Sequence, residues 1–545
     1  MTIRDYFERA VSDFPDAVFQ HFHDGTKWAT RTYAESRARV LRAVSVVSEF
    51  VPKRSEHSRV AIMLENCPDW QLLYVAITGL GLTVVPIDPK LRATEVAHIL
   101  RDSEAVCVFA GEKQRPVIER ATSDFSFAPL AVYDLEARLD SLSPADLSKA
   151  QLRWDETRPD EETLASLIYT SGTTGRPKGA MLTHGCFAAN VEQTMKRVPF
   201  YRTDNFLNVL PLFHAFSFMG NFLLPLCTGA STSFIRSLRT IAEDMLELHP
   251  SILLAVPLLA EKLYQRIESN LNKSLVASGM MRFNLSRKFV ARKILERFGG
   301  KMRLIGIGGA PTAHDTLRGF QKLGLDILEG YGITECAPGV AYPSLDAYKV
   351  GTVGPVLTGM EYKLVDPDET GAGELYVKGP NVMKGYWKNP EQTAAAFDVD
   401  GFYKTGDIVR IDETGNVSIC GRTKALIVNR EGKNIYPEEI EQALEHAPLI
   451  KDVIVLGYRV GTETGEHVGA ILVPNEEAIT AHLKGRVLTQ DEMAKFIREY
   501  ALGVCRASVA DYKIPRKFEV RFEPLERTSS MKVRRVVYAK TLDEA

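Results

Sequence analysis

Residues 169–179, with the sequence YTSGTTGRPKG, are the most informative stretch of this chain. Within it, residues 171–175 offer hydroxyl side chains, two glycines and several backbone N–H groups in five positions. Glycines let a backbone curl around an anion and approach it closely. Lys178 adds a positive charge at the edge, so the stretch predicts a loop that binds a polyphosphate. The spacing is not that of a Walker A loop, in which Gly-Lys-Ser/Thr follows four residues after a glycine.

Length and composition predict a soluble globular protein of two or three domains. The chain has 545 residues, 45% of them hydrophobic and 25% charged. A net charge of −2 gives no basis for binding nucleic acid. The N-terminus carries acids where a secretory signal would be apolar, and no apolar run is long enough to span a bilayer. With seven scattered cysteines that form no metal or redox motif, this predicts a cytoplasmic protein without an integral membrane segment.

Alternating strand and helix patterns predict an α/β fold. Residues 60–64 and 82–87 are short apolar runs typical of buried strands, and residues 69–79 between them have helical periodicity. Further strands are expected at 303–307 and 324–328. Repeated strand–helix units favour a large N-terminal domain of doubly wound, mostly parallel sheets covered by helices.

The pattern changes towards the C-terminus. Short strands and turns replace the alternation and predict a β-rich subdomain at about residues 350–420. A boundary then separates a large N-terminal domain, 1–420, from a small α+β domain, 421–545. The small domain contains a predicted helix at 437–445 that begins with proline.

Residues 271–298 have a helical pattern that is rich in lysine and arginine, with Glu296 as the one acid. Such a segment is typical of the solvated outer face of a helix. A helix that lies peripherally on an anionic membrane surface is the alternative, and both interpretations stay open.

Several motifs together resemble those of the adenylate-forming superfamily, which includes acyl-CoA synthetases, firefly-type luciferases and peptide-synthetase adenylation domains. The resemblance runs from about residue 20 to the C-terminus, and residues 169–179 match the AMP-binding signature. It implies that the ATP phosphates are held by Ser171, Gly172, Thr173, Thr174, Gly175 and Lys178.

Residues 330–335, GYGITE, resemble the family's adenine and magnesium motif. An aromatic ring between two glycines can lie flat on a purine, and a carboxylate is a hard oxygen ligand suited to Mg²⁺. Residues 308–311, GGAP, resemble the loop that lines the other face of the adenine. The resemblance therefore implies that Glu335 binds Mg²⁺ and that the adenine is contacted by Gly309, Ala310, Pro311, Tyr331, Gly332 and Thr334.

Residues 403–407, YKTGD, resemble the ribose motif, in which an acid accepts hydrogen bonds from the sugar hydroxyls. Asp407 would be that acid, and Arg422 would reach ribose or α-phosphate oxygens. Lys424 occupies the family's hinge position, although Ala425 stands where the family usually has an acid. The resemblance implies a mobile small domain that turns about this hinge between two half-reactions.

Lys532, in the sequence SSMKVRR at 529–535, resembles the C-terminal lysine that assists adenylation. Attack of a carboxylate on the α-phosphate brings two anions together, so a preorganised cation is needed. Thr170 and His214 complete the catalytic residues that the resemblance implies.

The sequence around His214 indicates a hydrophobic carboxylic acid as substrate. Residues 211–220, PLFHAFSFMG, are mostly aromatic or aliphatic, as expected for an apolar pocket. Amino-acid-activating relatives have an acid here, but Asp204, upstream of the motif, is the only acid between residues 201 and 239. Candidates to line the acyl tail are Phe218, Asn221 and Gly306.

The same motif bears on the acyl acceptor. Ligases that load carrier proteins typically have His-Asp-Met-Gly where this chain has His-Ala-Phe-Ser, which favours CoA. The resemblance implies that Gly432 lines the pantetheine tunnel and makes Arg516 and Lys517 candidates for the CoA phosphates.

The main hypothesis is an ATP-, Mg²⁺- and CoA-dependent acyl-CoA synthetase that makes acyl-AMP and then acyl-CoA, with a fatty acid as substrate. A bulky aromatic or polycyclic acid, or a carrier protein as acceptor, are the alternatives. A non-catalytic ligand-binding relative is disfavoured because Lys178, Glu335, Asp407, Arg422 and Lys532 are all present. Chain length, pathway and oligomeric state stay open, and a homodimer is compatible with the sequence.

Overall fold

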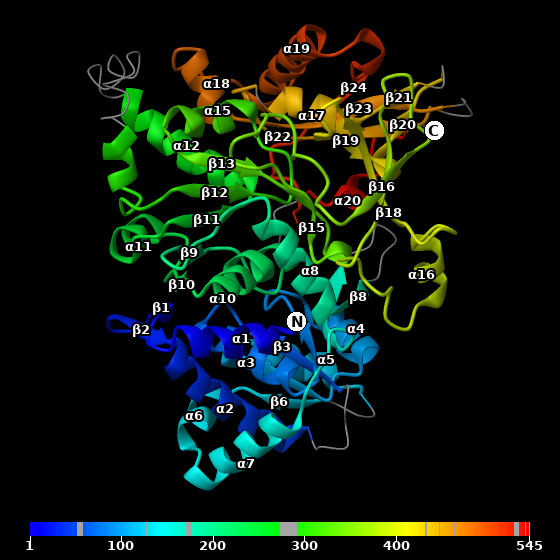
Figure 1. Cartoon of the computed structure of the whole chain (residues 1–545). Coiled ribbons are helices and arrows are strands. Elements are labelled where there is room, and N and C mark those ends of the chain that lie inside the picture. The colour runs from blue at the N-terminus through cyan, green and yellow to red at the C-terminus, as the bar shows by residue number, and fades with distance from the viewer. Residues whose placement is uncertain are drawn as a thin grey trace. The chain divides into compact units, whose positions relative to one another are not determined.

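The computed structural model describes residues 1–51, 58–125, 129–170, 177–272, 291–430, 433–445, 447–460, 465–527, 533–539 and 541–543 (Figure 1). These residues form two compact units, residues 1–361 with 378–403 and residues 362–377 with 404–545. In the part of the chain so described, no helix has both the length and the apolar character needed to span a bilayer.

The first unit contains a seven-stranded sheet in the order β13-β12-β11-β9-β10-β1-β2. Neighbouring strands are parallel, except for the antiparallel pair β1 and β2. The strands are β1 (Val18–His23), β2 (Trp28–Thr32), β9 (Asn205–Asn208), β10 (Ser231–Phe234), β11 (Ile252–Ala255), β12 (Leu304–Ile307) and β13 (Asp326–Glu329). The strands predicted at 303–307 and 324–328 are confirmed as β12 and β13.

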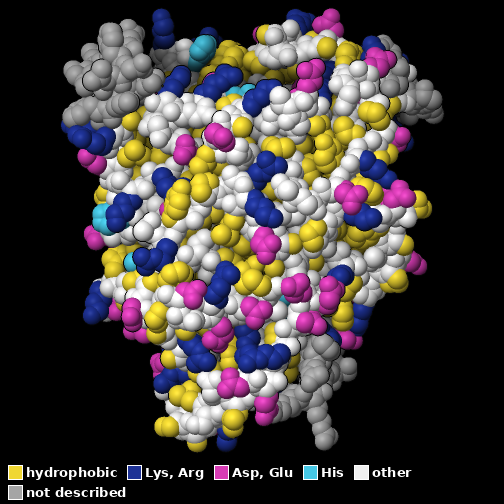
Figure 2. Space-filling model, viewed as in Figure 1, with side chains coloured by type: hydrophobic (Ala, Val, Ile, Leu, Met, Phe, Trp, Pro, Cys, Tyr) yellow, Lys and Arg dark blue, Asp and Glu magenta, His cyan; other side chains and the backbone are white. Residues whose placement is uncertain are grey.

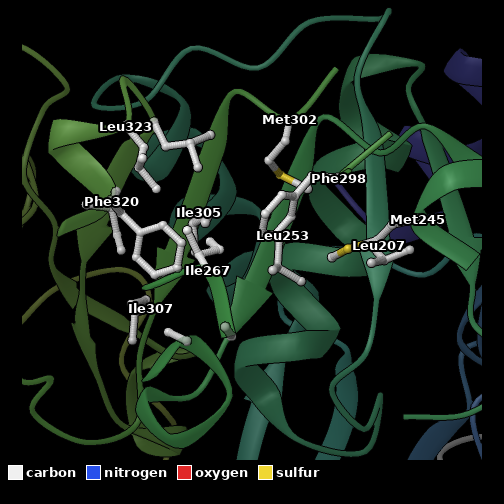
Figure 3. Close-up of a cluster of buried hydrophobic side chains, with 14 of the residues drawn as sticks. Leu207, Met245, Leu253, Ile267, Phe298, Met302, Ile305, Ile307, Phe320 and Leu323 are labelled. Carbon is white, nitrogen blue, oxygen red and sulfur yellow. The ribbon is translucent and has the colours of Figure 1, made fainter. Parts of the chain in front are cut away.

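One face of this sheet is covered by helices α11 (Ile241–Leu248), α12 (Pro257–Asn272) and α15 (His314–Lys322). Leu253 of β11 and Ile305 of β12 point to this face and pack with Met245 and Phe320 in one apolar cluster (Figure 3). The other face meets a continuous helical segment formed by α9 (Ala215–Phe218), the π-helical turn η2 (Met219–Leu223) and α10 (Leu224–Thr228). Helices therefore lie on both faces of the sheet, as is usual for parallel strands.

A second sheet of the first unit has six strands in the order β6-β5-β3-β4-β7-β8. Its strands are β3 (Arg59–Met63), β4 (Thr83–Pro86), β5 (Cys107–Ala110), β6 (Leu130–Val132), β7 (Leu164–Thr170) and β8 (Lys178–Thr183). They are parallel apart from the antiparallel pair β7 and β8 at the edge. Helices α4 (Ala93–Ser103) and α5 (Arg115–Thr122) pack on one face. The α/β class with parallel sheets is thus confirmed.

The remaining elements of the first unit are mostly helical. They are α1 (Ile3–Asp13), α2 (Tyr33–Phe50), α3 (Pro68–Gly79), α6 (Leu135–Ser141), α7 (Pro144–Glu156), α8 (His184–Met195), β14 (Tyr331–Gly332), β15 (Gly339–Ala341) and α16 (Pro390–Ala396). The helix predicted at 69–79 is confirmed as α3, which begins at a proline as favoured for the first helical position.

The second unit combines small sheets with helices. A four-stranded sheet runs in the order β16-β17-β18-β19, and a three-stranded sheet in the order β22-β23-β24. Bounds are β16 (Glu361–Val365), β17 (Gly373–Lys378), β18 (Tyr403–Ile411), β19 (Val417–Arg422), β20 (Ile427–Val428), β21 (Asn434–Ile435), α17 (Pro437–Glu445), β22 (Ile450–Tyr458), β23 (His467–Pro474), α18 (Glu476–His482), α19 (Gln490–Ser508), β24 (Lys517–Val520) and α20 (Arg535–Tyr538). Ile440 of α17 and Ile497 of α19 pack with Val455 of β22 in the core of this unit. The division into domains 1–420 and 421–545 stays a prediction.

On the face in view, lysine and arginine side chains are interspersed with aspartate and glutamate side chains (Figure 2). Most of the basic segment predicted at 271–298 lies outside the described residues, since the description stops at 272 and resumes at 291.

Candidate active site

The predicted phosphate-binding loop is carried by the hairpin of β7 and β8. Thr170 is the last residue of β7 and pairs with Lys178, the first residue of β8. One position earlier, the hydroxyl of Tyr169 donates a 2.6 Å hydrogen bond to Asp102 of α4, which anchors the base of the hairpin. The predicted phosphate contacts between the two strands, Ser171, Gly172, Thr173, Thr174 and Gly175, lie outside the described residues.

Lys178 lies at the rim of an open hollow of about 450 Å³. Its ammonium group donates to Oε1 of Gln392 and lies 5.1 Å from the ring centre of Tyr386. The hollow is lined by His98, Asp102, Pro177, Lys178, Trp387, Lys388, Asn389 and Gln392. A lysine placed beside such a solvent-accessible space can receive an anionic group, as the prediction requires.

Tyr386 also contacts the predicted metal ligand. Its hydroxyl donates a 3.0 Å hydrogen bond to Oε1 of Glu335 and lies 3.4 Å from the hydroxyl of Tyr403. The backbone carbonyl of Glu335 accepts a 2.8 Å hydrogen bond from Met383. Burial raises the pKa of both phenols, with the Glu335 carboxylate adding to the effect, so they stay protonated and able to donate. Tyr386 thus brings Lys178 and Glu335, two predicted site residues, into one group of contacts.

The predicted adenine loop follows β12. Gly309 has a φ of +97°, a conformation that favours glycine, and both Gly309 and Ala310 are exposed. Just after Pro311, the backbone N–H of Thr312 donates a 2.6 Å hydrogen bond to Oε1 of Glu329 at the end of β13. Glu329 is 6% exposed, and burial raises its pKa to about 7. This hydrogen bond ties the loop to the strand that leads into the GYGITE motif.

Within that motif, Tyr331 and Gly332 form the short strand β14, which pairs with β15. A Cβ atom at Gly332 would lie 2.4 Å from the carbonyl oxygen of Pro338, so this position has no room for a side chain. Thr334 and Glu335 follow in a single 3₁₀ turn, Thr334–Cys336. Strands β11, β12 and β13 are parallel, so the loops after them share one edge of the sheet, where α/β proteins bind ligands.

His214 directly precedes α9, at its N-cap position but without a side-chain capping hydrogen bond, and lies near the same edge. Its ring is half-buried and packs 4.5 Å from the ring of Phe213. Two residues later, Phe216 lies against the adenine loop, since a Cβ atom at Gly308 would be 3.3 Å from its ring. Of the predicted tail contacts, Phe218 and Asn221 are fully buried, Phe218 among the rings of Tyr74 and Phe222, whereas Gly306 is partly exposed.

The predicted ribose residues belong to the second unit. Asp407 of β18 and Arg422 of β19 face each other across the antiparallel pair, and Arg422 Nε donates a 2.8 Å hydrogen bond to Asp407 Oδ1. The Asp407 side chain is 4% exposed and that of Arg422 is 51% exposed. A carboxylate can accept further donors beyond this one, as a ribose contact requires. Lys424 follows in a 3₁₀ turn, Thr423–Ala425.

Lys532 and Gly432 lie outside the described residues, but the chain on either side of Lys532 is well anchored. Arg527 and Val533 form an antiparallel bridge, and Arg527 donates a 2.7 Å hydrogen bond to Asp452. Arg535 donates to the half-buried Glu441 and, at 2.8 Å, to the carbonyl of Val455. The two CoA candidates lie at β24, where the Arg516 backbone N–H donates to Val468 and Lys517 Nζ donates to Leu542.

Sequence reasoning missed Tyr386, Tyr403 and Glu329. The signal for Tyr386 is the stretch GYWKNP at 385–390, in which a glycine precedes two aromatics and a helix start. Tyr403 belongs to the recognised YKTGD motif, and Glu329 directly precedes the GYGITE motif.

Glu335 fits the predicted Mg²⁺ chemistry. Its carboxylate is half-buried and held by a phenol donor. The residues that the structure describes contain no group of three or more His, Cys, Asp or Glu that could hold a metal. Mg²⁺ in nucleotide sites uses one or two carboxylates and completes its coordination with water and substrate phosphates, so a single carboxylate is compatible with it.

Several known proteins are similar to this chain in sequence and in fold. A family model described as "AMP-binding enzyme" matches residues 7–387, more than half of the chain. Long-chain-fatty-acid–CoA ligase FadD15 of Mycobacterium bovis is 29% identical, covering 87% of this chain and 82% of that protein. Long-chain-fatty-acid–CoA ligase 1 of Cavia porcellus is 30% identical, covering 89% and 75%. The crystal structure of ATP-bound MatB from Rhodopseudomonas palustris has a TM-score of 0.76 at 27% identity, with 99% of each chain covered.

Proposed function

The chain belongs to the family of AMP-binding enzymes, and we propose that it joins a fatty acid to coenzyme A with the cleavage of MgATP. At the coarser level it is an ATP-dependent acyl-CoA ligase. The names of the relatives support a fatty acid as the substrate, and the apolar surroundings of His214 support a hydrophobic acid in general.

The proposed reaction has two steps. A carboxylate oxygen attacks the α-phosphorus of ATP, the bond to the bridging oxygen breaks, and acyl-AMP and pyrophosphate form. The sulfur of CoA, having lost its proton, then attacks the acyl carbonyl carbon, and AMP leaves with the pair of electrons of the acyl–oxygen bond. In the first step Lys532 would offset the charge that builds up around the α-phosphorus.

The single observation that carries the proposal is the contact group of Lys178, Tyr386 and Glu335. A cation for a polyphosphate and a carboxylate suited to Mg²⁺ share one tyrosine as neighbour. Bound Mg²⁺ would neutralise phosphate charge, and Glu335 would hold it. Tyr386 orients the carboxylate, Lys178 binds phosphate oxygens, and Asp407 with Arg422 receives the ribose.

The surroundings of Asp204 support an acid without an α-amino group. Asp204 is the only acid in the sequence between residues 201 and 239, and it already accepts hydrogen bonds from Arg303, at 2.8 Å to Oδ1, and from Ser251. It is 3% exposed. A buried carboxylate that is paired in this way belongs to the fold and is not available for a substrate ammonium group.

A bulky aromatic or polycyclic acid is the second candidate substrate, and a carrier protein is the second candidate acceptor. The test is to supply MgATP and a panel of fatty, aryl and polycyclic acids with either CoA or a phosphopantetheinylated carrier protein. Release of AMP that depends on both a fatty acid and CoA is the expected result. Acyl transfer to the carrier protein without transfer to CoA would overturn CoA as acceptor.

We also propose the division into domains 1–420 and 421–545, with Lys424 as hinge. Proline fixes φ and stiffens the backbone, so Lys424→Pro should hinder rotation between the half-reactions. Acyl-AMP formation should persist in this variant while thioester formation slows. Equal loss of both half-reactions, or of neither, would contradict the hinge. A cytoplasmic location completes the proposal, and sedimentation of the purified protein would determine the oligomeric state, which the sequence leaves open.

A further inference from the structure

Leu254 of β11 and Gly306 of β12 are direct neighbours across the parallel pair. The residues just before them, Leu253 and Ile305, are also paired and belong to the apolar cluster under α11, α12 and α15 (Figure 3). Successive side chains of a strand point to opposite faces. Leu254 and Gly306 therefore point to the other face, towards α9 and η2.

On that face, two glycines leave room for one leucine side chain. A Cβ atom at Gly220 of η2 would lie 2.0 Å from Cδ1 of Leu254, and one at Gly306 would lie 2.8 Å from Cδ2. Both separations are far shorter than van der Waals contact. The branched end of Leu254 thus occupies the space that a side chain at either glycine would need.

The backbone next to this leucine, at Gly306, is accessible to solvent. Gly306 is partly exposed although β12 is an inner strand, whereas Ile305 and Ile307 are 0% and 1% exposed. Inner strands of a parallel sheet are normally buried on both faces, so solvent-accessible space reaches Gly306. Leu254 itself is 6% exposed, and its side chain adjoins Gly306.

Gly306 lies one residue before the end of β12, close to the edge where the adenine loop follows. Gly308 is two residues beyond Gly306, about 7 Å along the strand, and contacts the half-buried ring of Phe216. His214 precedes Phe216 by two residues at the start of the same helical segment. From edge to interior, the order is therefore His214, then Phe216 with Gly308, then Gly306 with Leu254.

We propose that Leu254 closes the inner end of the acyl pocket and sets the length of the acid that the enzyme accepts. This inference rests on the proposed function and names the residue that determines its substrate range. The carboxylate would lie at the edge, the tail would pass Phe216 and lie over Gly306, and its last carbons would meet Leu254. One methylene more or less in an apolar pocket changes relative kcat/KM about 10–200-fold, so such a stop selects strongly.

The test compares kcat/KM for acyl-CoA formation across straight-chain saturated acids of increasing length. Leu254→Ala removes the stop, and Leu254→Val does so in part, which keeps the test usable if the alanine variant fails to fold. Both should move the preferred acid to a longer chain, with relative kcat/KM for longer acids raised about tenfold or more in Leu254→Ala. Gly306→Ala should move the preference to a shorter chain.

Leu253→Ala is the matched control, because it shortens the adjacent leucine of the same strand on the opposite face. It should lower stability without moving the preferred chain length. An unchanged length profile in an active Leu254→Ala variant, or an equal shift in Leu253→Ala, would overturn the role of Leu254. Wild-type protein that makes neither acyl-AMP nor acyl-CoA from any acid would instead overturn the proposed function.

A double-mutant cycle tests the packing without any activity measurement. Gly220→Ala alone should lower the melting temperature, because the new methyl group strikes Leu254. In the Leu254→Ala background the same change should cost much less, since the occupied space has been vacated. Additive effects of the two substitutions would show that Gly220 and Leu254 do not share this space and would contradict the inference.

Discussion

The hydroxyl of Tyr386 donates a 3.0 Å hydrogen bond to Oε1 of Glu335, and the Tyr386 ring lies 5.1 Å from the ammonium group of Lys178. Burial raises the pKa of Tyr386, so the phenol remains a donor at neutral pH. The carboxylate is thereby fixed in one orientation next to the strand that carries the phosphate-binding lysine. In metal sites, loss of a partner that orients a ligand in this way typically lowers metal affinity about 10–100-fold.

Tyr386→Phe removes this hydrogen bond and keeps the ring. We expect the concentration of Mg²⁺ required for half-maximal acyl-AMP formation to rise about 10–100-fold. Titration of Mg²⁺ at fixed ATP measures the change. Tyr6→Phe, which changes a tyrosine buried elsewhere in the first unit, is the matched control and should leave the titration unaltered. An unaltered titration in Tyr386→Phe would show that the hydrogen bond does not position a metal ligand.

Lys532→Ala should slow acyl-AMP formation by about 10²–10³, a loss of roughly 2–4 kcal/mol of transition-state stabilisation. Thioester formation from added acyl-AMP should be spared, because that step does not build charge on phosphorus. Single-turnover measurements of the two half-reactions separate these effects. Lys451→Ala, at an exposed position of β22, is the control. Unchanged adenylation in Lys532→Ala would refute the assigned role.

Glu329→Gln should change how the stability of the fold depends on pH, because it replaces a buried carboxyl group with a neutral amide. Burial raises the pKa of Glu329 from 4.5 to about 7, so the folded state favours the protonated form. Its contribution to stability is fully present below pH 4.5 and is lost as the pH rises towards 7. Glutamine stays neutral and still accepts from Thr312. The free energy of unfolding of the variant should therefore equal that of the wild type near pH 4.5. Above pH 7 it should be higher by up to about 3 kcal/mol.

Melting temperatures of the two proteins between pH 4.5 and pH 8 measure this difference. Gln114→Glu offers a converse control, because it places a new carboxyl group at a buried glutamine and should destabilise the protein most at high pH. If the difference in melting temperature between Glu329→Gln and the wild type does not change with pH, Glu329 does not ionise in this range.

Arg535→Met should weaken the second unit by leaving Glu441 without its guanidinium partner. Burial already raises the pKa of Glu441 to about 7, and Arg535 opposes that rise. The Arg535 and Glu441 side chains are 30% and 13% exposed, so removing one partner should cost up to about 3 kcal/mol, which corresponds to an increase of up to about 100-fold in amide hydrogen exchange at β22. Adding Glu441→Gln should recover part of the loss. Arg534→Met, at the exposed neighbour, should have little effect. Equal rates of amide hydrogen exchange at β22 in all variants would show that the pair of Arg535 and Glu441 does not stabilise the second unit.

The sequence predicted well those features that depend on local patterns. Strands β12 and β13, helix α3 and helix α17 follow from apolar periodicity and from prolines at helix starts. Lys178 and Glu335 each lie in a short motif that resembles one of the family's, and the structure shows that both contact Tyr386, while their roles stay predictions. These signals are read within about ten neighbouring residues, so no long-range packing had to be known.

The features that were missed depend on contacts between distant segments. Tyr386 and Glu335 are 51 residues apart, and Thr312 and Glu329 are 17 apart. Leu254 is an ordinary strand leucine in the sequence. Its significance comes from two glycines, Gly220 and Gly306, that the fold places beside it. Side-chain packing of this kind is decided by how sheets and helices meet, which periodicity alone does not report.

The most direct test of the central claim is mass-spectrometric detection of products from the wild-type protein with MgATP, CoA and a panel of fatty, aryl and polycyclic acids. The account predicts fatty acyl-CoA from one band of chain lengths, with AMP and pyrophosphate formed in equal amounts. Acyl-AMP that accumulates without any thioester would contradict CoA as the acceptor. Absence of both acyl products with every acid would contradict the ligase activity itself.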